Sequence, residues 1–145
     1  DPAAESPEPV AAEVEDLRAR INAADALLIV TPEFNAGPPG YLKNAIDWAS
    51  RPHKASSLAG KPAAIVSQSP MPFGGIWANQ SIRKSFTITG TPTVERELAI
   101  GKVDEKIEDG RLADDQARAD LTALMAELNE LVAVIADQDQ EAVPA

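Results

Sequence analysis

The sequence predicts an α/β fold, a doubly wound parallel sheet with helices packed on both of its faces. Two short apolar runs, at residues 26–30 and 62–66, have the composition of strands buried on both faces. Between them, apolar residues at positions 42, 45, 46 and 49 follow helical spacing. A strand, a helix and a second strand joined by short links form a βαβ unit, which requires the two strands to be parallel.

Three further helices are expected around this unit. The first starts near Pro9, from which apolar side chains recur on one helical face at Val10, Val14, Leu17 and Ile21. Another covers about 76–88. The last helix has the clearest pattern, with Asp114 and Asp115 near its start and apolar residues at steps of three and four from 121 to 135.

A third strand is expected within 93–100, centred either on Val94 or on 98–100, and the charged span 101–110 is expected to be an exposed loop. The element order is therefore α, β, α, β, α, β, α. We expect residues 1–145 to form one domain, with a flexible lead at 1–8, where prolines 2 and 7 oppose a helix, and a fraying tail at 138–145.

Composition excludes several classes of protein. The 145 residues include no cysteine and one histidine, which excludes disulfides, thiolate catalysis and cysteine- or histidine-rich metal sites. No apolar run approaches a membrane span and no signal segment opens the chain, so we expect a cytoplasmic protein. The net charge of −10 argues against nucleic acid as a partner. Residues 26–103 nevertheless carry +4, which favours an anionic ligand such as a nucleotide there.

Two loops follow the first two predicted strands, at 31–40 and 67–75, and both are rich in proline and glycine. Ligands of open α/β sheets bind at the carboxyl ends of the strands, where such loops offer backbone amides. Each loop carries one aromatic residue, Phe34 or Phe73, suited to flank a flat ring. The alternative is that both are simply tight turns. Neither holds a known phosphate-binding string, although Gly74-Gly75 could place a phosphate at a helix start.

The sequence offers no convincing catalytic side chain. His53 lies in a polar loop without a nearby partner, and Glu33 and Asp47 do not obviously converge. Ser67 and Ser69 lack the glycine-flanked elbow of serine hydrolases. We therefore expect no catalytic residue and no metal site, and if the domain is an enzyme, a cofactor supplies the chemistry.

The string from Thr31 to Asn35, followed by Pro39-Gly40-Tyr41-Leu42-Lys43-Asn44-Ala45-Ile46-Asp47-Trp48, resembles the signature of the NAD(P)H-dependent FMN reductase family. The resemblance extends to residues 58–62 and to Ser69-Pro70 and Phe73-Gly74-Gly75. It implies a flavodoxin-like fold and FMN reduced by NADPH or NADH. The acceptor would be a quinone, metal oxyanion, azo compound or flavin. The flavin ring would lie along Pro32, Glu33, Phe34 and Asn35. Its pyrimidine side would be covered by Ser69, Pro70, Phe73, Gly74 and Gly75.

This chain also departs from the family's pattern at several points. Phe34 stands where the family usually has tyrosine, and Met71 and Pro72 stand where glycine is common. Members begin with a strand and a phosphate-binding loop that do not precede Asp1, so three strands of an expected five are present and the first of them is expected to be an exposed hydrophobic edge.

The family implies a homodimer or homotetramer. Two other hypotheses remain open. One is a cofactor-free flavodoxin-like binding or assembly module that self-associates through Trp48 and Trp77. The other is a nucleotide-binding α/β domain unrelated to flavin.

Overall fold

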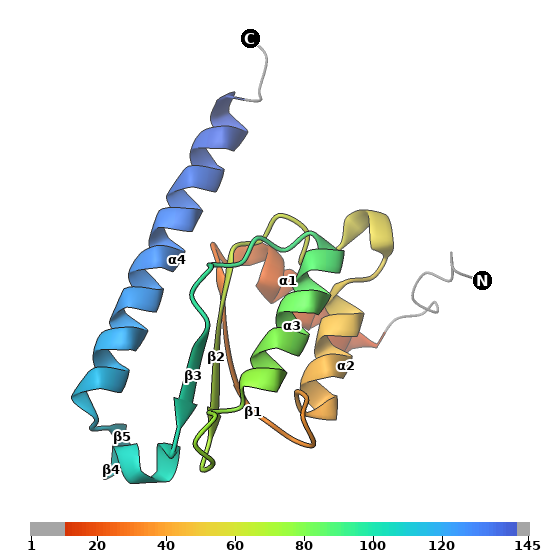
Figure 1. Ribbon diagram of the computed structural model, residues 1–145. Helices are drawn as coiled ribbons and strands as arrows, with labels where there is room; N and C mark the ends of the chain where they lie inside the picture. Colours follow the sequence, from red (N-terminus) through yellow and green to blue (C-terminus); the bar gives the residue numbers. More distant parts are fainter. Residues whose placement is uncertain (1–10, 142–145) are drawn as a thin grey trace.

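The computed structural model describes residues 11–141, in which a three-stranded sheet is covered by helices on both faces (Figure 1). The strands are β1 (Leu27–Pro32), β2 (Ala63–Ser69) and β3 (Leu98–Gly101), parallel and in the order β1-β2-β3. One face carries α1 (Ala12–Ala23), α2 (Gly40–Ala49) and α3 (Ile76–Thr89), and the other carries α4 (Asp115–Glu141). This confirms the predicted doubly wound parallel α/β fold.

Alternate residues of β2 supply the two halves of the core, as expected for a strand covered on both faces. Ile65 packs with Ile82 and Phe86 of α3, and all three are fully buried. Val66 points the other way and packs in a second cluster with Leu124 and Leu128 of α4. The long helix predicted from its apolar periodicity is therefore held to the sheet by the residues that define that periodicity.

The third strand confirms one of the two expected positions, residues 98–100, because β3 spans Leu98–Gly101. Val94 precedes it as a buried residue, and the neighbouring Thr93 forms only an isolated bridge to Ala63. The short helices η1 (His53–Ala55) and η2 (Val103–Lys106) complete the connections on either side of β2 and β3.

One expectation was wrong in detail. The span 101–110 is not simply a loop, because β4 (Ile107–Glu108) and β5 (Arg111–Leu112) form an antiparallel hairpin. Its two turn residues, Asp109 and Gly110, have φ of 48° and 74°, as a two-residue hairpin turn requires. Helix α4 continues to Glu141, and the fraying tail expected at 138–145 stays a prediction, since 142–145 lie outside the described residues. The expected flexible lead at 1–8 lies outside the described residues.

Strand β1 forms one edge of the sheet, since within residues 11–141 it pairs with β2 alone. Leu28 and Val30 on this strand are 42% and 64% exposed. Both share a face with Ala64 and Val66 of β2, their register partners, which is the side that α4 covers over β2 and β3. The exposed hydrophobic edge expected from the sequence is therefore present.

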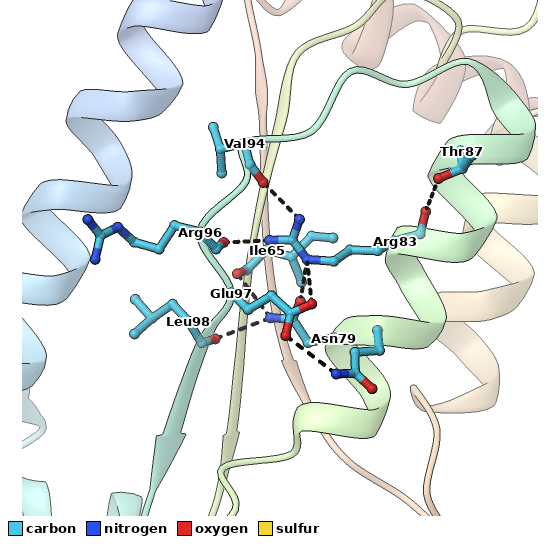
Figure 2. Close-up of polar contacts among 9 residues, drawn as sticks. Ile65, Asn79, Arg83, Thr87, Val94, Arg96, Glu97 and Leu98 are labelled. Atoms are coloured by element: carbon cyan, nitrogen blue, oxygen red, sulfur yellow. Dashed lines mark hydrogen bonds and ion pairs between the residues drawn. The ribbon is translucent and has the colours of Figure 1, made fainter.

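Polar side chains of α3 fix the segment that leads into β3 (Figure 2). The fully buried Asn79 amide donates to the carbonyls of Ile65 and Leu98, at 3.2 Å each. The Arg83 guanidinium donates to the carbonyl of Val94 at 2.8 Å and to that of Arg96. Burial lowers the pKa of Arg83, an effect that Glu97 opposes. These bonds tie α3 to carbonyls of β2, of β3 and of the segment between Val94 and Arg96, and so fix where β3 lies.

In the part of the chain that the structure describes, no helix is both long enough and apolar enough to cross a bilayer. The same residues contain no group of three or more histidine, cysteine, aspartate or glutamate side chains placed to hold a metal ion.

Candidate functional site

The two proline- and glycine-rich loops leave the sheet at the same edge. Strands β1 and β2 are parallel neighbours, and their last register pairs are Thr31 with Ser67 and Pro32 with Gln68. Both strands therefore lead into their loops side by side, at the lower edge of the sheet as drawn in Figure 1. This is the edge at which open α/β sheets bind ligands.

The first loop is built on a tight turn from Phe34 to Gly37. The amide of Phe34 donates to the Gly37 carbonyl at 2.9 Å, and the Gly37 amide donates back to Phe34 at 3.1 Å. The two central residues, Asn35 and Ala36, have positive φ of 51° and 62°. Asparagine tolerates this conformation well, whereas alanine is strained by it. The turn leaves the Phe34 ring 56% exposed at the tip.

The second loop rests on the end of β3. Gly74 has a φ of 62°, and a Cβ atom there would lie 2.5 Å from the Ala99 carbonyl carbon and 2.7 Å from the Gly101 nitrogen. Its glycine is therefore required by contact with the protein's own backbone. Before Gly74 in this loop, the Ser69 hydroxyl accepts the Met71 amide at 3.1 Å, and Phe73 is 72% exposed.

The loops are joined directly through Glu33 and the start of α3. Glu33 Oε2 accepts the backbone amide of Ala78 at 3.1 Å. A Cβ at Gly75 would lie 3.1 Å from the Glu33 Cβ and 3.4 Å from the Ser67 Cβ, so these residues pack closely. The carboxylate thus occupies the helix start where the sequence suggested that a phosphate could bind.

The predicted site residues fall into two groups. Phe34, Asn35, Pro70 and Phe73 are exposed, whereas Gly74 and Gly75 are buried. The remaining three, Pro32, Glu33 and Ser69, are partly buried. Sequence reasoning missed the roles of Ala78, Ala99 and Gly101, because these depend on how α3 and β3 pack against the loops.

The side chains that were rejected as catalysts on sequence grounds lie in other environments. His53 is exposed in η1. Glu33 bonds to the α3 amide, while Asp47 pairs with Lys43 on the surface of α2. Ser67 Oγ is fully buried, and among the described residues it is the one buried side-chain N or O atom without a hydrogen-bond partner.

Comparison with known proteins decides the family. Residues 1–105 match the family described as NADPH-dependent FMN reductase. The chain belongs to this family. It is 41% identical over 109 residues to a quinone reductase of Pseudomonas putida and 44% identical over 107 residues to an NAD(P)H-dependent FMN reductase of Pseudomonas aeruginosa. These alignments cover 74% and 72% of this chain, but 59% and 57% of the respective relatives, so the chain spans less than two thirds of their length.

The fold of the family is present as well. The structure matches FerB, a flavoenzyme NAD(P)H:(acceptor) oxidoreductase from Paracoccus denitrificans, with a TM-score of 0.71 and 32% identity. The match covers 89% of this chain and 70% of that one. The sheet with its flanking helices is therefore flavodoxin-like, as the resemblance in sequence implied.

Proposed function

We propose that this chain functions as an NAD(P)H-dependent FMN oxidoreductase that passes reducing equivalents to a small-molecule acceptor such as a quinone. Family membership supports this, as do relatives named quinone reductase and NAD(P)H-dependent FMN reductase. The observation that carries the proposal is the joined pair of loops at the carboxyl edge of β1 and β2, with two exposed phenylalanine rings.

The residues present fit the flat ring of a flavin better than its phosphate. Exposed aromatic side chains and rigid backbone on adjoining loops suit a planar heterocycle. The start of α3, by contrast, already holds the Glu33 carboxylate. We assign the ring contacts to nine residues of the two loops: Pro32, Glu33, Phe34, Asn35, Ser69, Pro70, Phe73, Gly74 and Gly75.

Bound FMN would accept hydride from NADPH or NADH and deliver electrons to a quinone, metal oxyanion, azo compound or second flavin. The chain's own contribution is shape, water exclusion and backbone hydrogen bonding, and we assign no side chain as a catalyst. Because the reaction draws on reduced nicotinamides, we also propose a cytoplasmic location.

We further propose a homodimer or homotetramer. Tyr41 on α2 and Trp77 on α3 are 70% and 55% exposed, although aromatic rings of this size are usually covered. Both helices follow the two loops, so association through them would enclose the ligand edge. Size measurement by sedimentation would test this directly, and a monomer at all concentrations would refute it.

The test of function is a titration of the purified chain with FMN, followed by NADPH oxidation with a benzoquinone acceptor. Phe34→Ala and Phe73→Ala should each weaken FMN binding about tenfold, since stacking on one aromatic ring contributes about 1–3 kcal/mol. Ile88→Ala is the matched control, because Ile88 is 83% exposed near the far end of α3. Its FMN affinity should equal that of the parent chain.

Three outcomes separate the hypotheses. FMN binding with NADPH oxidation supports the oxidoreductase. A folded protein that self-associates but shows no flavin absorbance and no thermal shift with excess FMN favours the cofactor-free module. Stabilisation by ATP but not by FMN favours a nucleotide-binding domain unrelated to flavin.

A further inference from the structure

Glu33 supplies from one loop the helix cap that the other loop lacks. The N-cap residue of α3 is Gly75, which has no side chain to accept the amides of the first turn. Glu33 Oε2 accepts the third of these amides, that of Ala78, across 45 positions of sequence. A side chain from the loop after β1 therefore accepts the amide that a serine or aspartate N-cap at position 75 would ordinarily accept.

Close packing fixes where this carboxylate lies. Gly75 is buried with a φ of 74°, and the space beside its Cα is bounded by the Cβ atoms of Glu33 and Ser67. Ser67 is itself fully buried on β2. The stem of Glu33 is consequently held against the second loop while its carboxylate reaches the helix.

The same contact sets the electrostatics of the helix start. The positive end of the α3 dipole faces a carboxylate, which it stabilises. Of the other amides there, Ile76 donates to the Phe73 carbonyl and Asn79 to the Gly75 carbonyl, at 3.3 Å each, and the Ala78 amide also donates to the Gly75 carbonyl at 3.1 Å. A phosphate approaching this end would meet like charge, and the amides of Ile76, Ala78 and Asn79 already have acceptors.

We propose that Glu33 is a positioning residue with two effects. It fixes the second loop against the first through the first turn of α3, and it keeps anions away from that helix end. The loop pair then receives the uncharged ring system of a flavin. Only this last step rests on the proposed function, because the contact and the exclusion of anions are properties of the unliganded chain.

The first experiment therefore uses the unliganded chain and three variants, Glu33→Ala, Glu33→Gln and Glu130→Gln. Glutamine keeps an acceptor oxygen for the Ala78 amide, and Glu130 is an exposed carboxylate on α4 that controls for the loss of one charge. Amide exchange and chemical shifts of Trp77 and Ala78 are measured by NMR, with circular dichroism to show that each variant is folded.

In Glu33→Ala the Ala78 amide should exchange about fivefold faster, the size expected for the loss of one capping bond. Glu33→Gln should restore protection, and Glu130→Gln should change nothing. Titration with inorganic phosphate should shift the Trp77 and Ala78 amides in Glu33→Ala but not in the parent chain. An Ala78 amide whose exchange and chemical shift are both unchanged in Glu33→Ala would overturn the contact, since the amide keeps its bond to the Gly75 carbonyl in that variant. Equal phosphate shifts in the parent would overturn the exclusion of anions.

The second experiment measures riboflavin affinity, because riboflavin carries the ring without the phosphate. Glu33→Ala should weaken binding about fivefold, with near-parental affinity in Glu33→Gln. Unaltered affinity in Glu33→Ala would show that Glu33 is a structural cap alone and overturn its positioning role. If the parent chain binds neither riboflavin nor FMN, the proposed function fails, and the contact and the exclusion of anions are still decided by the first experiment.

Discussion

Replacing Gly74 by alanine should destabilise the protein far more than the same change at Gly90. Both residues have positive φ, 62° and 71°, so both substitutions place alanine in the left-handed region at a cost of about 1–2 kcal/mol. Both also reduce the entropy of the unfolded chain equally. What differs is the space around the new Cβ atom.

At Gly90 a Cβ meets nothing within 4 Å. At Gly74 it would lie 2.5 and 2.7 Å from the carbonyl carbon and oxygen of Ala99, which are backbone atoms that no rotamer change can move. The loop must lift from β3, and overpacking of this kind costs about 1–3 kcal/mol more. We therefore expect Gly74→Ala to lower the free energy of unfolding by about 2–5 kcal/mol and Gly90→Ala by about 1–2 kcal/mol.

Urea unfolding followed by circular dichroism and tryptophan fluorescence measures both values, and thermal unfolding should show a difference of about 2–4 °C per kcal/mol. Equal losses at the two positions would refute the reasoning, since the shared φ penalty would then account for everything. The result also determines how flavin data are interpreted. If Gly74→Ala displaces the loop, loss of flavin binding in that variant does not show contact between Gly74 and the ring.

Three other predictions follow from the packing of the described residues. Ala36→Gly should raise the free energy of unfolding in urea by about 0.5–1 kcal/mol, because it removes the strain of a φ of 62°; no gain would contradict that strain. Arg83→Lys should lower it by about 1–3 kcal/mol, because an ammonium cannot reproduce the forked donation to Val94 and Arg96, and a neutral result would show that these bonds contribute little. Val30→Lys should also make the exposed β1 edge less prone to pair with another copy, measured as less concentration-dependent association in sedimentation velocity, where an unchanged distribution would exclude a contribution of this edge beside that of α2 and α3.

The layers of the fold could be predicted because periodicity reports burial directly. The continuous apolar runs at 26–30 and 62–66 correspond to the parallel strands β1 and β2. Of the apolar positions in 121–135, Leu124 and Leu128 are buried, and Leu121, Met125 and Leu131 pack partly buried against the same cluster. Asp114, expected near the start of that helix, caps it by accepting the Ala117 amide at 2.8 Å. The β4–β5 hairpin was missed even though Asp109-Gly110 carries its turn signal, because strands of two residues leave no alternation to detect.

The candidate site was predictable only as far as local sequence determines it. Parallel neighbouring strands require the two loops to share an edge, and proline and glycine indicate that the loops are rigid. The hydrogen bond from the Ala78 amide to Glu33 and the close contact of Gly74 with Ala99 join residues far apart in sequence. No local pattern encodes such contacts, because they depend on where α3 and β3 lie relative to the loops.

These tertiary contacts are connected in series and support the two loops from behind the edge of the sheet where the ligand is proposed to bind. Asn79 fixes Leu98 at the start of β3, the end of β3 seats Gly74, and the loop from Gly74 leads into the helix turn that Glu33 caps. Each link is satisfied within the protein, so the loops hold their shape before any ligand arrives. A preorganised site does not lose loop entropy on binding. Asn79 is not among the proposed ligand contacts and lies behind the loop. Asn79→Ala should therefore weaken flavin binding at temperatures where the protein remains folded. An unchanged affinity would show that the loop keeps its shape without support from β3.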